Sequence, residues 1–172
     1  MKEFPSSQEK TMKNIYLASV NPMHFSHLNT FLEAQKKLGE VVYFCICHNP
    51  TKKEGIFSLE ERADIAHRFY DVPIEQIVIL PDREAIVSAI RNSQVIIRGI
   101  RSEADIAEVK KLVEHYGVHG DFDKGLLITV PDNMKQISSS RLIEKIKLGE
   151  YKTDDNWILP ELLSTIKEKL KV

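Results

Sequence analysis

The sequence has 172 residues and a formal net charge of −1, with 24 basic and 25 acidic side chains. This length favours one domain, and the balanced charge excludes the overall basic surface of a nucleic-acid-binding domain. No apolar run approaches the roughly 18 residues of a membrane-spanning helix. Residues 1–13 lack the apolar core of a signal peptide, so we expect a disordered extension followed by a single cytoplasmic domain over residues 14–172. Cys45 and Cys47 lie in an apolar run and are expected to be reduced and buried.

Strand-like apolar runs alternate with amphipathic helical segments along the chain. In order, the pattern predicts a strand over 15–19, a helix over 28–38, a strand over 40–48, a helix over 58–70, a strand over 76–80, a short helix around 86–90, a strand over 93–97, a helix over 109–116, a strand over 126–130, and two final helices from about 139 and 160. Gly39 and Gly117 should end two of these helices, and Ser58 with Glu61 forms a capping box. The alternation predicts an α/β fold with a doubly wound parallel sheet, whose ligands bind at the carboxyl ends of the strands.

Two histidines follow the first predicted strand, in the segment ASVNPMHFSH over 18–27. His24 and His27 are three residues apart, so both imidazoles should share one face at the positive end of a helix, a place that suits a phosphate. There they could stabilise charge on a phosphate under attack. The alternatives are packing, capping or a metal pair, although no carboxylate or cysteine follows at the spacing of a zinc enzyme.

Lysines and serines follow two other strands. Lys52 and Lys53 follow the second strand and should reach the same edge of the sheet as the histidines, where a lysine can bridge two phosphates. As an alternative, they are solvated surface lysines. The serines at 138–140 open a helix, and their hydroxyls with free backbone N–H groups can hold an anion, cap the helix, or do both.

Two arginines end the fourth predicted strand, which lies beside the first in this architecture. Arg98 and Arg101 flank Gly99, which would permit a tight turn and close approach of the backbone. Arginines next to an apolar run are costly unless they hold anions or carboxylates. They are therefore expected to bind phosphate or, alternatively, to pair with Glu103 and Asp105.

These segments resemble the motifs of a known superfamily. Residues 18–27 are similar to the G-x-F-x-P-x-H-x-G-H signature of nucleotidyltransferases, with Ala18 and Ser26 in place of glycines. Four later segments are similar, in order, to those of phosphopantetheine adenylyltransferases: NPTKK with FSLEER over 49–62, IRGIR over 97–101, ISSS over 137–140, and ILPE over 158–161. The resemblance covers residues 14–172 and implies a Rossmann-like nucleotidyltransferase fold with five parallel strands in the order 3-2-1-4-5.

The resemblance also implies roles for individual residues. The implied catalytic residues are His27, Lys52 and Arg101. The implied ATP-binding residues are Ser19, His24, His27, Arg101, Ser138, Ser139 and Ser140. The implied acceptor-binding residues are Ser19, Lys52 and Arg98. No metal ligand from the protein is expected, because Mg²⁺ would be carried by the polyphosphate.

The reaction that the resemblance implies is transfer of AMP from ATP to 4'-phosphopantetheine in coenzyme A synthesis, giving dephospho-coenzyme A and pyrophosphate. Two alternatives stay open. One is a related nucleotidyltransferase for another acceptor, such as nicotinamide mononucleotide or a sugar or polyol phosphate; His24 is more typical of the nicotinamide-mononucleotide and cytidylyl branches. The other is a degenerate nucleotide-binding homologue. The segment before 138 does not match the R-T-x-G-I-S-T-T of cytidylyltransferases, which favours ATP over CTP. We expect a homo-oligomer with no nucleic-acid or membrane partner.

Overall fold

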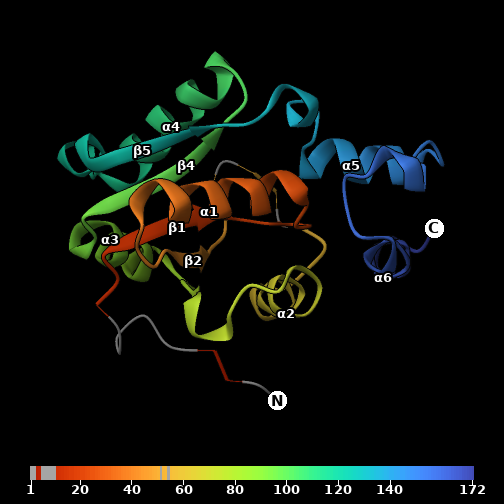
Figure 1. The fold of residues 1–172 in the computed structure, drawn as a ribbon, viewed down its shortest axis with the longest axis horizontal. Helices are drawn as coiled ribbons and strands as arrows, with labels where there is room; N and C mark the ends of the chain where they lie inside the picture. Colours follow the sequence, from red (N-terminus) through yellow and green to blue (C-terminus); the bar gives the residue numbers. More distant parts are fainter. Residues whose placement is uncertain (1–2, 5–10, 51, 54) are drawn as a thin grey trace.

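The computed structural model describes residues 3–4, 11–50, 52–53 and 55–172 of the chain. Within them, five parallel strands form one sheet in the order β3-β2-β1-β4-β5 (Figure 1). The predicted fold class and strand order are therefore confirmed. The strands are β1 (Asn14–Ala18), β2 (Tyr43–Ile46), β3 (Ile77–Ile79), β4 (Val95–Ile100) and β5 (Gly125–Thr129). Because β1 pairs with both β2 and β4, the order of the chain reverses beside β1, where such sheets bind ligands.

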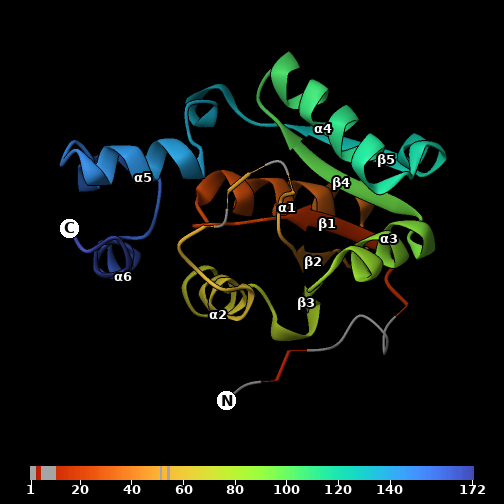
Figure 2. The same ribbon diagram turned by 180° about the vertical axis from the view of Figure 1, so that it is seen from behind.

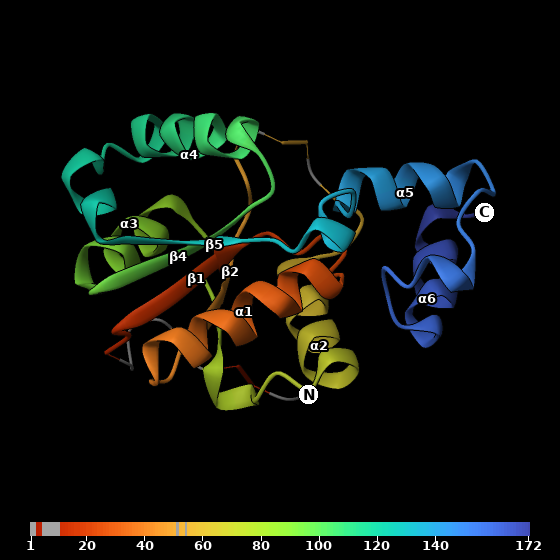
Figure 3. The same cartoon turned by 45° about the horizontal axis from the view of Figure 1, so that its top comes forward.

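Helices cover both faces of the sheet. One face carries α1 and α2, and the opposite face, seen in Figure 2, carries α3 and α4. Figure 3 shows α5 and α6 beyond the end of the sheet at which α1 begins. The helices are α1 (Phe25–Leu38), α2 (Leu59–Tyr70), α3 (Arg83–Asn92), α4 (Glu103–Tyr116), α5 (Ser139–Lys147) and α6 (Pro160–Leu170).

The two layers of helices create two hydrophobic cores. Tyr16 and Ala18 of β1 face the core under α1 and α2, whereas Ile15 and Leu17 face the one under α3 and α4. All five residues of β1 are consequently buried, as expected for a parallel strand covered on both faces. Cys45 and Cys47 of the second core are buried and free, as predicted. Trp157 is buried in the first core, in agreement with a packing role.

Local signals set most helix ends as predicted. Gly39 ends α1 and Gly117 ends α4, each in the left-handed conformation that glycine adopts easily. Ser58 and Glu61 form the expected reciprocal capping box of α2. Other boundaries were wrong: β2 is shorter than the predicted strand over 40–48, and α3 is longer than the helix predicted around 86–90. β4 runs on to Ile100 and α4 begins at Glu103, so both extend beyond the apolar patterns that predicted them.

The predicted extension over 1–13 falls largely outside the described residues, and the division of the chain at residue 14 stays a prediction. At the described end of this segment, Met12 is buried and its sulfur lies 3.8 Å from the Cys45 sulfur. None of the described helices is both long and apolar enough to cross a bilayer.

Candidate active site

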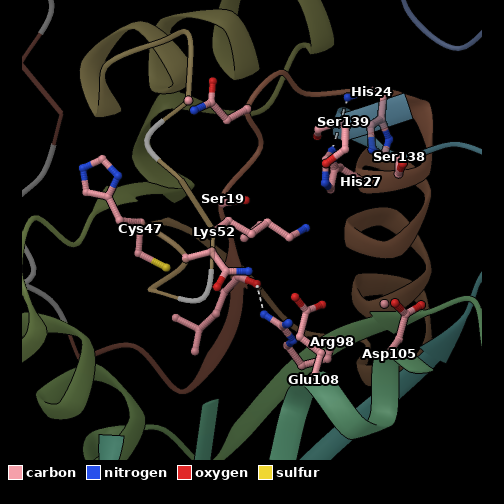
Figure 4. A pocket seen from close by; sticks show the side chains of 18 of the residues that line it. Ser19, His24, His27, Cys47, Lys52, Arg98, Asp105, Glu108, Ser138 and Ser139 are labelled. Atoms are coloured by element: carbon pink, nitrogen blue, oxygen red, sulfur yellow. Dashed lines mark hydrogen bonds between the residues drawn. The ribbon is translucent and has the colours of Figure 1, made fainter. Parts of the chain in front are cut away.

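A cavity of about 820 Å³ opens at the carboxyl ends of β1, β2 and β4. The amino-terminal ends of α1 and α5 form one wall, and Asp105 and Glu108 of α4 lie at another (Figure 4). Residues of α3 also line the cavity. The structure brings together in this cavity all the site residues expected from the sequence: Ser19, His24, His27, Lys52, Arg98, Arg101, Ser138, Ser139 and Ser140. Their individual roles stay predictions.

The two histidines stack on one another at the start of α1. His24 is the N-cap, and its ring lies 3.7 Å from the ring of His27 at an interplanar angle of 17°. The backbone N–H of His24 donates to Nδ1 of His27 at 3.3 Å, so His27 caps the helix as well as lining the cavity. With Nδ1 accepting, a neutral His27 carries its proton on Nε2, which is then available to donate.

Both imidazoles are neutral at pH 7. Burial lowers the pKa of His27 to about 3, with further lowering by the positive charges of Arg101, Lys52 and Arg98. Burial and the neighbouring His27 likewise hold the pKa of His24 well below its usual range. Positive charge in the cavity therefore comes from its lysines and arginines, and an uncharged His27 can still donate a hydrogen bond.

These shifts predict that the ligand-free protein loses stability on mild acidification. Between the unfolded pKa of 6.5 and the folded pKa of about 3, the unfolded chain binds a proton at His27 that the folded protein does not. Stability must then fall as the pH falls, by about 1–2 kcal/mol for His27 between pH 7 and pH 5. Thermal unfolding at the two pH values measures this loss, and His27→Gln should flatten the dependence. An equal loss in both proteins would contradict the assignment.

Arg98 and Gly99 lie within β4 rather than after it. The Arg98 guanidinium donates through Nη1 to the Leu17 carbonyl at 3.2 Å, so it reaches across to the end of β1 and lines the cavity. The expectation of a turn at Gly99 is wrong, because Gly99 of β4 pairs with Ile128 of the parallel strand β5. A Cβ at Gly99 would lie 2.7 Å from the Thr30 hydroxyl of α1, so glycine is needed there for close packing.

Arg101 is fixed by a carboxylate at its side. It forms an ion pair with Asp105 at 3.1 Å, its backbone N–H donates to the same carboxylate at 2.6 Å, and Nη1 donates to the Ile137 carbonyl at 3.1 Å. Burial would raise the pKa of Asp105, but the hydrogen bonds from Arg101 outweigh it and lower that pKa. The expected alternative of pairing with Asp105 thus occurs while Arg101 still lines the cavity.

The serines of α5 combine capping with contacts across the site. The Ser138 hydroxyl accepts from the Arg141 backbone N–H at 3.2 Å, which is ordinary N-capping. The Ser139 hydroxyl donates to the Pro22 carbonyl at 2.8 Å and so ties α5 to the segment that precedes α1. This contact brings the amino-terminal ends of two helices to the same wall of the cavity, which favours bound anions.

Ser26 occupies a tight position in the first turn of α1. It is buried, lines the cavity, and its carbonyl accepts from the Thr30 hydroxyl at 3.1 Å. We expect Ser26→Gly to lower the Michaelis constant for ATP a few-fold, because a bare backbone lets the nucleotide lie closer. The lower helix propensity of glycine should reduce the free energy of unfolding by less than about 1 kcal/mol. Steady-state kinetics with both substrates varied checks this, and loss of activity would give the hydroxyl a direct role instead.

Among the described residues, no group of three or more histidine, cysteine, aspartate or glutamate side chains is placed to hold an ion. The Asp105 carboxylate at the wall is engaged by Arg101. A Mg²⁺ ion carried by the phosphate oxygens of a bound nucleotide stays a prediction.

One buried side chain of the cavity was missed at the sequence level. Arg62 lines the cavity, although its motif FSLEER was interpreted only as the start of a helix and as part of the family resemblance, with no role for the arginine. Its position on the buried face of amphipathic α2 was the available signal, because arginine is rarely buried without specific partners.

Comparison with known proteins agrees with this geometry. A family model described as cytidylyltransferase-like matches residues 15–145. The nicotinic acid mononucleotide adenylyltransferase of Plasmodium falciparum has a similar fold: its complex with NaAD has 19% identity and a TM-score of 0.57, covering 93% of this chain and 97% of that one. Its complex with APC has 17% identity and the same TM-score, covering 95% and 97%. No curated protein matches. Because the family match spans most of the chain, this protein belongs to the cytidylyltransferase-like family of nucleotidyltransferases.

Proposed function

We propose that this protein transfers AMP from ATP to the phosphate of a small phosphorylated acceptor and releases pyrophosphate. One observation carries the proposal: a neutral hydrogen-bond donor, His27, and several basic side chains, Lys52, Arg98 and Arg101 among them, converge on one cavity at the point where the strand order reverses. Such a set can bind two phosphate-bearing substrates and stabilise charge between them.

The chemistry requires positioning more than acid–base catalysis. An oxygen of the acceptor phosphate attacks the α-phosphorus of ATP in line, and the bond to the β-phosphate oxygen breaks. The attacking oxygen is already ionised at pH 7, so no protein base is needed. In this mechanism Nε2–H of His27 donates to the α-phosphate as it becomes pentavalent, Lys52 bridges the two reacting phosphates, and Arg101 with the amino-terminal end of α5 holds the β- and γ-phosphates.

The fold comparisons support a pyridine mononucleotide as the acceptor. Both similar structures are of an adenylyltransferase named for nicotinic acid mononucleotide. That compound bears the phosphomonoester that Lys52 and Arg98 could hold. Nicotinic acid mononucleotide, with nicotinamide mononucleotide beside it, is accordingly the first acceptor to test.

A specific feature of the cavity supports 4'-phosphopantetheine as the second candidate. Besides Arg98, the cavity is lined by aliphatic residues of α3 and α4, by Cys47 directly after β2 and by Tyr116 at the end of α4. Apolar walls suit an uncharged, elongated tail better than a nicotinate carboxylate, whose burial needs a donor. The aliphatic residues are Ile86, Ile90 and Leu112.

A panel of acceptors tests the proposal. Pyrophosphate release is measured with ATP or CTP against nicotinic acid mononucleotide, nicotinamide mononucleotide, 4'-phosphopantetheine and glycerol 3-phosphate. We expect ATP to exceed CTP with one acceptor, and the dephosphorylated form of that acceptor to be inactive. Binding of ATP without release in any combination would overturn the proposal and favour a degenerate nucleotide-binding homologue.

A further inference from the structure

Arg62 is a fully buried cation that joins two segments of the candidate site. Its side chain extends from the first turn of α2, and the residue is 1% exposed. Nε donates to the Phe57 carbonyl at 2.9 Å and Nη1 donates to the Ser19 carbonyl at 3.2 Å. Ser19 follows β1, and Phe57 lies at the end of the segment that carries Lys52. A buried guanidinium is costly unless its donors are used, so these bonds hold the two segments together.

The same two segments meet at a second point. The Asn21 side-chain oxygen accepts from the Phe57 backbone N–H at 3.1 Å. Beside it, Gly55 lies directly against the Asn21 amide, and a side chain at Gly55 would collide with that amide. The segment around Ser19 is thus fixed to the segment before α2 through side-chain and backbone contacts together.

We propose that Arg62 is a positioning residue that, with Asn21 and Gly55, clamps Ser19 and the Lys52-bearing segment in one arrangement. The consequence for turnover rests on the proposed function of the cavity. Two guanidinium donors are directed at carbonyl groups, so Arg62 acts through the segments it joins. Displacement of reacting groups by about 1 Å can cost a hundredfold in rate with little change in ground-state binding. The clamp should therefore affect kcat more than KM.

Arg62→Lys is the sharpest test, because one ammonium cannot reproduce the planar fork that reaches two carbonyls. We expect kcat to fall about tenfold or more while KM for ATP stays within about threefold. Arg68→Lys is the matched control: Arg68 lies on the same helix, is exposed, and pairs with Asp64 at 3.0 Å. The control should keep wild-type kcat, and a wild-type kcat in Arg62→Lys would overturn the proposal.

A second set of variants keeps the proposal testable if Arg62→Lys does not fold. Asn21→Ala and Gly55→Ala should each lower kcat, the first by losing the bond to Phe57 and the second by displacing the Asn21 amide. In the double variant the methyl group added at position 55 no longer meets the Asn21 amide. The fall in kcat should therefore not exceed that of the more impaired single variant. Additive losses would mean that the two residues do not act as one clamp.

Amide hydrogen exchange gives a readout that needs no turnover. The Phe57 amide should exchange faster in Asn21→Ala and Arg62→Lys than in the wild-type protein and Arg68→Lys. Unchanged exchange in both would overturn the clamp. Wild-type protein that releases no pyrophosphate with any acceptor would refute the proposed function alone, since the exchange rates still decide on the clamp.

Discussion

His27→Ala is expected to lower turnover by about a hundredfold or more, with a much smaller change in the affinity for ATP. The neutral ring accepts from the His24 backbone N–H at Nδ1, which leaves the Nε2–H available to donate to a ligand in the cavity. That donor gains most as the α-phosphate takes on charge in the transition state. Losing such a preorganised donor costs roughly 2.7–4 kcal/mol of transition-state stabilisation.

Steady-state pyrophosphate release with the active acceptor measures this effect. The exposed His115 of α4 supplies the control, because His115→Ala removes an imidazole outside the cavity and should leave kcat unchanged. Calorimetric titration with ATP separates binding from turnover. A His27→Ala protein that turns over within about threefold of wild type would remove His27 from the mechanism.

The sequence predicted where the site lies because a parallel sheet has a strong geometric constraint. Once strands were recognised at 15–19, 40–48 and 93–97, their carboxyl ends had to meet at one edge. His27, Lys52 and Arg98 follow or end those strands, so they could be placed together without any knowledge of side-chain packing. The cavity lined by all three agrees with that reasoning.

The limits of β4 could not be predicted because they depend on a ligand cavity rather than on a core. The apolar run ends at Ile97, and the arginine and glycine that follow it are more typical of a loop than of a strand. The strand nevertheless continues to Ile100, since β5 pairs with it from Ile96 to Ile100 and Arg98 lines the cavity. A strand end that faces a polar ligand site has no hydrophobic signature.

Contacts between distant segments were also beyond the sequence. The bond from Arg98 to Leu17 spans 81 residues, and that from Arg62 to Ser19 spans 43. Local periodicity reports which side of a helix is buried, but it does not report what the buried face meets. Arg62 was consequently overlooked as an organiser of the site, although it lies in a segment whose motif was recognised.

The two arginines of β4 and its following turn are expected to serve different substrates. Arg98→Ala should weaken the phosphorylated acceptor and leave ATP nearly unaffected, whereas Arg101→Ala should weaken ATP. Each loss should be roughly 1.5–3 kcal/mol, the scale of a hydrogen bond to a charged group. Their surroundings already differ, since Arg98 lies against Leu17 at the end of β1 and Arg101 lies against Ile137, next to the serines of α5.

Calorimetric titration of both ligands into both variants tests the assignment, and Asp105 makes the test sharper. Arg101→Ala also leaves the Asp105 carboxylate without its ion pair, so part of its effect could come from a displaced α4 or from repulsion of ATP. Asp105→Asn removes that charge while Arg101 stays, and the double variant removes both partners. If Arg101 holds ATP directly, Arg101→Ala and the double variant should bind ATP equally weakly, while Asp105→Asn binds it well. Recovery of ATP affinity in the double variant would show that Arg101 is needed only to neutralise Asp105. If Arg98→Ala instead weakens ATP and Arg101→Ala weakens the acceptor, the two substrate positions in the cavity are reversed.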